Sequence, residues 1–541
     1  MEKKTLIAIA LSFCVILLWQ LLFVKPPVTP SPESGVAPPG NATEEVTTEV
    51  APTVPTPAPG PVAAGEERII EIESPLYIAR VTTNEGRIAS FSLKDYRETI
   101  EEDSLPVDII PQELEKLSPK IAFDTNLGSF EENILYTTTA DSDYITIGGD
   151  KGNDPYSLVL MWEGDNFRVE KTYIFHPDTY GIDVTFTITN RAENNMDGEM
   201  SVSLFEYLST EKKGFRLFQN VEYPSNLIAY VDEGLKTEIV IKIKPEQEKT
   251  ITGDVTWFGF DSKYFLVAAA VPEGGSKTIT AVRTDENTIT GTYGIGEFSV
   301  PAGGQIKKEL VLYLGPKEAK ATEAVGHSLD ASINYGFFAF LSIPLVYLLK
   351  LFFSIVKNYG AAIIILTIVV RILLYPITYK SMKSMKELQK IQPLILAIRD
   401  KHKNNREKMN EEVMRLYQTH KINPLGGCLP LLLQIPVFIA LYKALYVAIE
   451  LRHSPFCLWI KDLSVMDPYY VTPIVMGLSY FVQQKMTPTT ADPIQQKVMM
   501  LMPVIFTVIF LNLPSGLVLY FFVSNLLSIG QQFYMNKFQK D

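Results

Sequence analysis

The sequence predicts a polytopic α-helical membrane protein that also carries a large all-β domain. Its C-terminal third contains apolar runs long enough to cross a bilayer. Residues 66–320 instead alternate apolar and polar side chains, as half-buried strands do. Charge divides the chain in the same way, because residues 66–320 carry a net charge near −19 and the remaining residues about +7. Such an acidic domain is poorly suited to bind nucleic acid or anionic lipid by charge alone.

Residues 1–24 are predicted to form the first transmembrane helix. A short basic start precedes an apolar run over residues 6–24 that is nearly long enough to span a bilayer. A cleaved signal peptide is the alternative, but no Ala-x-Ala site follows closely, so an uncleaved signal anchor is favoured. Residues 25–65 contain 11 prolines, a composition that prefers extended conformations and predicts a linker.

Residues 66–320 are predicted to form one large β-sandwich, a fold that suits about 250 residues. Apolar and polar residues alternate in two clear stretches. The apolar positions are Ile182, Val184, Phe186 and Ile188 in the first stretch, and Ile239, Ile241 and Ile243 in the second. Gly, Asn, Asp and Pro recur at short intervals, as they do in turns between strands.

No arrangement typical of an enzyme or a metal site is visible in the sequence. The cysteines Cys14, Cys428 and Cys457 lie in or beside apolar segments and form no disulfide framework or zinc spacing. The five histidines are scattered, and His176 in the β domain has no partner motif for acid–base catalysis. The sequence therefore predicts no catalytic residue, no metal site and no cofactor.

Residues 331–350 predict an amphipathic helix that lies in the membrane interface. They are apolar but are interrupted by Gly336 and Pro344. The next apolar run begins within about ten residues, which leaves too little chain to turn around after a further crossing. That next run, residues 351–379, is predicted to form the second transmembrane helix.

Arg371 lies inside the apolar run of the second predicted span. Counted along a helix, it is ~20 Å from Asn358 and ~13 Å from Lys380. No other predicted span carries an Asp or Glu in its interior, so Arg371 must find water, lipid phosphate, backbone carbonyls or a visiting partner. Snorkelling to the nearer interface is the simpler alternative. The distance from the polar boundary favours a hydrated cavity.

Residues 380–421 predict a hairpin of two amphipathic helices with a turn at Asn404 and Asn405. They contain 11 Lys or Arg and 5 Asp or Glu, a net charge of +6. This positive charge places the hairpin in the cytoplasm. We expect it to recruit the substrate or the ribosome through basic residues on its first helix, namely Lys383, Lys386 and Lys390.

Residues 425–533 predict transmembrane helices three to six, and residues 534–541 a short cytoplasmic tail. The four apolar segments are 425–448, 469–485, 498–512 and 517–533. Six spans put both termini in the cytoplasm and the acidic domain outside, in agreement with the basic loops. Polar residues recur within the spans: Thr367, Gln434, Thr507, Ser524, Asn525 and Ser528. Each alone is typical of helix–helix hydrogen bonding, but together with Arg371 they indicate a hydrophilic concavity.

Three motifs resemble the YidC/Oxa/Alb membrane-insertase family, and most closely its long Gram-negative bacterial members. They are residues 423–430 (NPLGGCLP), 484–490 (QKMTPTT) and 513–520 (LPSGLVLY). The resemblance runs from the N-terminal anchor to the C-terminus, although the β domain matches mainly in position and size. It implies an inner-membrane insertase and chaperone for nascent membrane proteins, which works alone or beside the Sec translocon.

The resemblance also implies a site: a groove in a five-helix core, open to the cytoplasm and to lipid, and closed toward the periplasm, where the β domain lies. The functional arginine of the family falls on Arg371. Other groove and substrate-contacting positions fall on Thr367, Gln434, Ile435, Phe438, Tyr520 and Phe521. Phe521 stands where a tyrosine is familiar in the family. Ribosome contact would rest on residues 380–421 and 484–497.

Two other classes of function are compatible with parts of the sequence. A transporter or channel could use the polar residues of the spans, but no internal repeat is visible and only five core spans are predicted. A membrane-anchored periplasmic enzyme would need a site that the β domain does not display.

Overall fold

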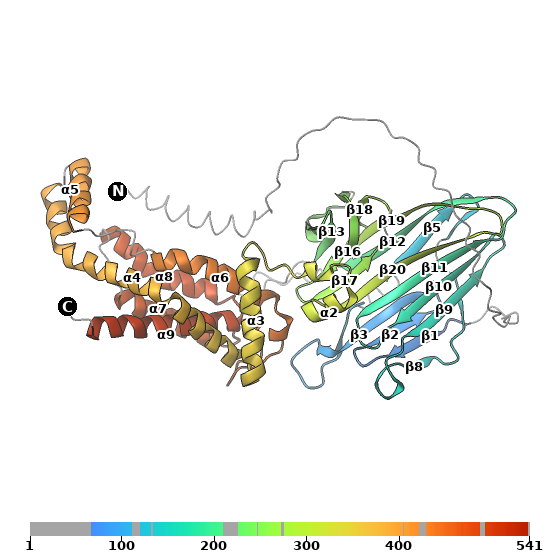
Figure 1. Cartoon of the computed structure of the whole chain (residues 1–541), viewed down its shortest axis with the longest axis horizontal. Helices are drawn as coiled ribbons and strands as arrows, with labels where there is room; N and C mark the ends of the chain where they lie inside the picture. Colours follow the sequence, from blue (N-terminus) through green and yellow to red (C-terminus); the bar gives the residue numbers. More distant parts are fainter. Residues whose placement is uncertain are drawn as a thin grey trace. The chain divides into compact units, whose positions relative to one another are not determined.

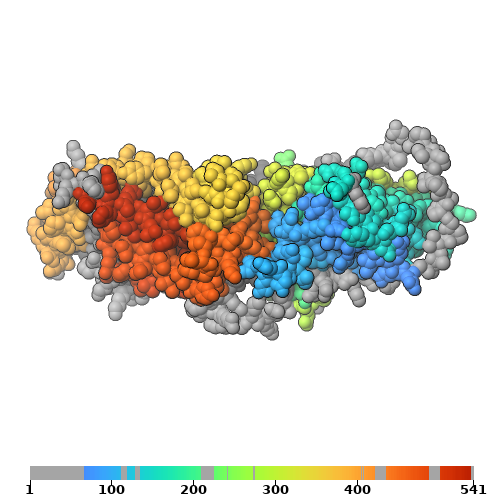
Figure 2. Space-filling model, turned by 90° about the horizontal axis from the view of Figure 1, so that it is seen from below, coloured from blue at the N-terminus to red at the C-terminus, as the bar shows by residue number. Residues whose placement is uncertain are grey.

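The computed structural model describes residues 66–110, 119–130, 134–208, 225–245, 247–271, 275–403, 405–420, 429–486 and 493–538. All elements given below belong to one compact unit of the chain. The predicted first transmembrane helix (1–24) and the linker (25–65) lie outside the described residues. Along the described chain, strands occupy residues 69–316 and the long helices residues 339–538 (Figure 1). In the space-filling view, the strand-bearing residues are coloured mainly blue to green and the long helices yellow to red (Figure 2).

The described strands of the β domain form three sheets. One has the order β4 (Pro106–Asp108), β3 (Arg87–Arg97), β2 (Tyr77–Thr82), β1 (Ile69–Glu73) and β8 (Tyr144–Thr146). The largest has the order β14 (Gly234–Ile239), β13 (Asn226–Val231), β16 (Val255–Asp261), β17 (Phe265–Ala270), β20 (Gln305–Pro316), β11 (Gly181–Asn190), β10 (Phe167–Phe175), β9 (Tyr156–Glu163) and β7 (Thr137–Thr138). The third has the order β15 (Lys249–Thr252), β18 (Thr278–Arg283), β19 (Thr288–Val300), β12 (Met196–Tyr207), β5 (Lys120–Thr125) and β6 (Gly128–Phe130).

A single cluster of buried apolar side chains extends through this domain, which confirms the predicted β-sandwich. The alternation at 182–188 is also confirmed, because β11 buries its apolar residues and pairs antiparallel with β10 and β20. The strand predicted over 239–243 is wrong. β14 ends at Ile239, and residues Val240–Lys242 form a 3-10 turn. The fully buried residues are Val240 and Ile243, three positions apart, and a turn buries such a pair better than a strand of period two.

Lys171 on β10 is buried in the centre of the domain, with 3% of its surface exposed. Its Nζ donates a hydrogen bond to the carbonyl of Gly86 at 2.7 Å, and the Tyr173 hydroxyl donates to the same carbonyl at 2.9 Å. Gly86 lies in the tight β2–β3 connection at a φ of 55°. Because burial removes water from the ammonium group, the pKa of Lys171 falls to about 7.

The helices of the described chain are α2 (Ala319–Val325), α3 (Ala339–Val356), α4 (Tyr359–Lys401), α5 (Arg406–Thr419), α6 (Leu429–Val447), α7 (Val471–Met486), α8 (Pro493–Phe510) and α9 (Ser515–Phe538). Short 3-10 helices cover Gly149–Lys151, Val240–Lys242, Leu329–Ser332 and Ile449–Leu451. By length and composition, three described stretches suit a membrane crossing: Ala339–Val356, Tyr359–Lys401 and Ser515–Met535. Shorter apolar helices cover Gln434–Val447 and Met500–Phe510. The number of crossings and the interfacial position of α3 therefore remain predictions.

The boundaries around α3 and α4 differ from those predicted. The helix expected over 331–350 begins only at Ala339, after Gly336 at a φ of 73°. It runs on to Val356, so residues 351–356 do not belong to the second span. Lys357 then adopts a left-handed conformation, and the side chain of Asn358 caps α4 by accepting from the amide of Ala361. These two residues form the whole connection between α3 and α4.

α4 continues without a break from the second predicted span into the predicted hairpin. Its 43 residues include Pro376 and Pro393. The helix persists beyond Pro376, where the hydroxyl of Thr378 bonds the carbonyls of Leu374 and Tyr375. The final turns of α4 pack against α5 through two groups of apolar side chains: Leu388, Ile391 and Ile395, and Val413, Leu416 and Tyr417.

The later helices also extend past their predicted limits. α8 begins at Pro493, five residues before the predicted span. α9 runs to Phe538, so residues 534–538 of the expected tail are helical. Residues 421–428, 487–492 and 539–541, which include parts of the motifs at 423–430 and 484–490, lie outside the described residues.

The connection between α6 and α7, residues 448–470, holds the N-terminal ends of α4 and α9. Asn358 donates from Nδ2 to the carbonyl of Phe456 at 3.0 Å, and Ser515 donates from Oγ to the carbonyl of Asp462 at 2.9 Å. Inside the connection, Asp467 accepts hydrogen bonds from Trp459 and from Thr472. This connection therefore holds the starts of two of the helices that carry the candidate site, α4 and α9.

Candidate functional site

The guanidinium of Arg371 is bound by a hydroxyl of a neighbouring helix. Its Nε and Nη2 donate to Oγ of Ser524 on α9, at 2.9 and 2.5 Å. Within the described residues, no Asp or Glu forms an ion pair with Arg371, and Ser524 is its hydrogen-bond partner. A neutral hydroxyl does not cancel the charge, so the arginine remains an uncompensated cation inside a helix that is otherwise apolar.

Gln434 and Tyr520 extend this contact to a third helix. Nε2 of Gln434 on α6 donates to the Tyr520 hydroxyl at 3.0 Å. Tyr520 lies one helical turn before Ser524 on α9 and is only 1% exposed. The predicted site residues Arg371, Gln434 and Tyr520 are thus brought together, with Ser524 at the centre.

Thr367 does not reach an open surface. It is fully buried, and its hydroxyl donates to the carbonyl of Ile363 in its own helix at 2.6 Å. The expectation that Thr367 is a polar position of a groove therefore does not agree with its place in the structure. It lies one turn before Arg371 on α4, but its hydroxyl is engaged with the helix backbone.

The predicted apolar positions form an aromatic contact between α6 and α9. The rings of Phe438 and Phe521 lie 5.0 Å apart, and Phe521 also contacts Phe510 of α8 at 4.7 Å. Ile435, one position after Gln434, is 44% exposed. Phe510 was not among the predicted site residues, although an aromatic pair at Phe506 and Phe510, one turn apart near the end of a span, was visible in the sequence.

Further polar side chains of α9 continue toward its C-terminal end. Asn525 donates to Ser479 of α7 at 3.4 Å, Gln531 to Thr378 of α4 at 3.2 Å, and Gln532 to the carbonyl of Met486 at 3.0 Å. The polar groups of α9 therefore bind α4 and α7 alternately. Asn525 was evident from the sequence as a polar residue within a span, but the hydrogen-bond partners of Asn525, Gln531 and Gln532 were not.

The three basic residues predicted for recruitment differ in their surroundings. Lys383 and Lys390 are exposed on α4. Lys386 instead donates from Nζ to the carbonyl of Met535, in the last turn of α9. Because the final carbonyls of a helix lack partners within the helix, this contact stabilises the end of α9.

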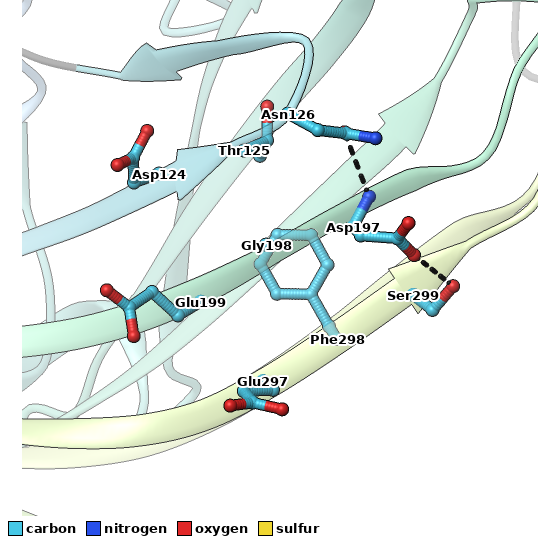
Figure 3. Close-up of a pocket in the computed structure, with 9 residues that line it drawn as sticks. All are labelled: Asp124, Thr125, Asn126, Asp197, Gly198, Glu199, Glu297, Phe298 and Ser299. Atoms are coloured by element: carbon cyan, nitrogen blue, oxygen red, sulfur yellow. Dashed lines mark hydrogen bonds between the residues drawn. The ribbon is translucent and has the colours of Figure 1, made fainter.

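A separate open cavity of about 780 Å³ lies on the β domain, against β5, β12 and β19 (Figure 3). Glu199 of β12 stands directly opposite Asp124 on one neighbouring strand and Glu297 on the other. Asp197 accepts a hydrogen bond from Ser299 and donates its amide to Asn126. No group of three or more His, Cys, Asp or Glu among the described residues is arranged to hold a metal ion.

Comparison with known proteins gives concordant matches over the two parts of the chain. A family model described as "60Kd inner membrane protein" matches residues 351–541, and one described as "YidC periplasmic domain" matches residues 69–348. The chain is 40% identical to the "Membrane protein insertase YidC" of Syntrophus aciditrophicus, over 99% of this chain and 100% of that one. It is also 40% identical to the protein of that name from Geobacter metallireducens, over 99% and 98%.

Among solved structures, the chain is similar to one titled as an active YidC insertase crystal structure with the first transmembrane domain resolved. The identity is 19%, the match covers 87% of this chain and 93% of that one, and the TM-score is 0.37.

Proposed function

Because the chain belongs to the YidC family of membrane protein insertases, we propose that it inserts nascent inner-membrane proteins through a groove that carries Arg371. The family is a class of insertases, not of enzymes, and the process makes and breaks no covalent bond. The observation that carries the proposal is the uncompensated guanidinium of Arg371, whose hydrogen-bond partner is the neutral hydroxyl of Ser524.

The charge of Arg371 gives the groove its mechanism. An arginine at the centre of a spanning helix costs about 2.5–3.5 kcal/mol on insertion scales, so it organises water around itself. A translocated segment that enters this water has only the remaining part of the bilayer to cross, ~15 Å instead of ~30 Å. An acidic segment also gains Coulomb attraction, which is stronger here than in bulk water.

The apolar part of a client is proposed to follow the aromatic side of the site. Ile435 and the ring pair of Phe438 and Phe521 lie on the two helices that also hold Gln434 and Ser524. A client helix at this position would contact apolar side chains on one face while its polar end stays near Arg371. It could then leave sideways into lipid.

We propose the following arrangement of the whole chain in the inner membrane. Residues 66–320 form the periplasmic domain, both termini and the hairpin at 380–421 face the cytoplasm, and six helices cross the bilayer, the first within residues 1–24. The net charge of +6 on the hairpin and the acidic β domain support this orientation. The proposed partners are nascent membrane proteins, the Sec translocon, the ribosome and membrane lipids.

Charge-reversal substitutions on α4 are expected to separate two roles of its lysines: recruitment of the ribosome or substrate, and stabilisation of the end of α9. Replacing Lys383 and Lys390 with Glu is expected to weaken ribosome co-sedimentation and to slow insertion. The difference from the native chain should be largest at low salt and shrink at higher salt, because salt screens exposed charges. Lys386→Glu is expected instead to lower the free energy of unfolding of the helical part by about 1 kcal/mol, because the carbonyl of Met535 loses its hydrogen-bond donor.

The matched control for recruitment is Lys408→Glu, an exposed lysine on α5. If the α4 double variant co-sediments and inserts as the native chain does, the hairpin is a solvated cap and not a recruitment element.

Deleting most of residues 66–310 is expected to leave insertion near the native rate. α3 is tied to the helical core independently of the β domain, through Ser342, which donates to the carbonyl of Ala440 at 3.0 Å, and through the ion pair of Lys350 with Glu450 at 2.5 Å. In vivo complementation and insertion assays measure the effect. A control deletion that also removes α3 should abolish insertion. A stably expressed 66–310 deletion with no insertion at all would contradict the expectation.

Reconstitution in proteoliposomes tests the function itself. The purified chain is expected to insert a small membrane protein while an imposed ion gradient persists. Flux of ions or solutes without client insertion would support the transporter or channel alternative and overturn the proposal.

A further inference from the structure

We propose that Ser524 is the positioning residue of Arg371, and that Tyr520 and Gln434 hold Ser524 in place. This inference rests on the proposed function, in which Arg371 receives the translocated segment. It assigns to Tyr520 a supporting role inside the protein in place of the client contact that the family resemblance implies.

The geometry fixes one edge of the guanidinium. Nε and Nη2 of Arg371 both donate to the same oxygen, Oγ of Ser524, at 2.9 and 2.5 Å. Two bonds from one edge define the plane of the group, while the Nη1 donors point away from that edge. Without this anchor, the long flexible side chain is free to snorkel toward the nearer interface, where its charge would no longer lie deep in the site.

The Ser524 hydroxyl accepts both bonds from Arg371, and Tyr520 lies one helical turn before Ser524 on the same face of α9. Gln434 donates to the Tyr520 hydroxyl at 3.0 Å. Tyr520 is 1% exposed and its hydroxyl accepts from Gln434, a placement that suits a supporting residue inside the protein. The network joins α4, α6 and α9.

A purely structural serine behaves differently in the same helix. The hydroxyl of Ser528, one turn further along α9, donates to the carbonyl of Ser524 at 3.1 Å. Thr367 and Thr378 on α4 likewise bond the backbone of their own helix. The Ser524 hydroxyl instead accepts from the side chain of Arg371 on another helix. Ser528 is buried to the same degree and therefore provides a matched control.

The test measures insertion, in proteoliposomes, of two versions of one client, with an acidic or a neutral translocated segment. Ser524→Ala is expected to lower insertion of the acidic version by about ten-fold, and of the neutral version much less, because a charge-assisted hydrogen bond to Arg371 is lost. Ser524→Thr, which keeps the hydroxyl, should restore most of the activity. Ser528→Ala should have no effect on either client, and Tyr520→Phe a smaller loss of the same kind as Ser524→Ala.

A double-mutant cycle distinguishes positioning from packing. In an Arg371→Ala background, Ser524→Ala should add nothing further. An equal additional loss in that background, or an equal loss for Ser528→Ala, would overturn the inference. If Arg371→Ala lowers insertion of the acidic client and Ser524→Ala does not, the positioning role fails and the proposed function stands. If Arg371→Ala has no effect, the proposed function fails.

Discussion

Replacing Arg371 with alanine is expected to lower the insertion of clients with acidic translocated segments by about ten-fold, which corresponds to roughly 1.4 kcal/mol of lost stabilisation. The variant loses the positive charge that Arg371 presents to the incoming segment, and it also loses the water that this charge organises. Clients whose translocated segments are short and apolar should be affected least. The measurement is the initial rate of insertion into proteoliposomes for matched acidic, neutral and apolar clients.

Arg371→Lys is the control for charge. Lysine keeps the positive charge but cannot place two N–H groups from one planar edge on Ser524, so it should retain much of the activity without reaching the native rate. Equal, native-like insertion of acidic clients by the alanine and lysine variants would leave snorkelling as the only role of Arg371.

Replacing Lys171 with methionine is expected to raise the free energy of unfolding of the β domain at pH 7, by about 1–3 kcal/mol. The ammonium group is buried, and its native pKa of about 7 lies well below the ordinary value of a lysine, 10.5. Between these values the unfolded chain binds more protons than the native one, so native stability rises as the pH increases above 7, by up to about 1.4 kcal/mol per unit. Below pH 7 both states are protonated and the slope disappears.

Lys171→Met should remove that rise, so the stability difference between variant and native chain should shrink from pH 7 to pH 9.5. The carbonyl of Gly86 keeps its bond from the Tyr173 hydroxyl, so no acceptor is orphaned. Lys307→Met, on an exposed lysine of β20, is the matched control and should change stability little. Chemical unfolding of the detergent-solubilised chain across this pH range measures both variants. A less stable Lys171→Met, or a pH-independent difference, would contradict the expectation.

The parts of the fold that follow from local periodicity were predictable from the sequence. The alternation at 182–188 marks a strand because each of its residues faces one side of the sheet in turn. The alternation at 239–243 looks the same but ends in a 3-10 turn, since the neighbouring Val240 takes the buried position. Residues 239–243 carry two overlapping apolar patterns, the alternating isoleucines and the pair of Val240 and Ile243. The neighbouring strands decide which pattern is buried, and the positions of those strands cannot be read from a single sequence.

The ends of the helices were less predictable from the sequence than the presence of the helices. Pro376 lies within α4, a residue that ordinarily ends a helix, yet the chain around it remains helical. In contrast, the break between α3 and α4 is made by Lys357 and Asn358, of which only the asparagine is a recognised turn or cap residue. Tertiary packing decided both cases.

The candidate site was predictable by residue type but not by partner. Arg371 was evident as a charge in an apolar run, and Gln434 and Ser524 as polar residues within spans. Their hydrogen bonds join positions about 90–150 residues apart, for which the sequence carries no periodic signal. The burial of Thr367 and Tyr520 likewise depends on the helices that cover them.

Photo-crosslinking of stalled nascent chains tests the central claim, that clients pass beside Arg371 along α6 and α9. A photoreactive phenylalanine analogue at Phe438 or Phe521 keeps the ring shape of the native residue, and the same analogue at Ile474, an exposed apolar position on α7, serves as control. The account predicts strong crosslinks to the client's first membrane segment from Phe438 and Phe521 and few from Ile474. Crosslinks of equal yield from Ile474, or none from Phe438 and Phe521, would contradict it.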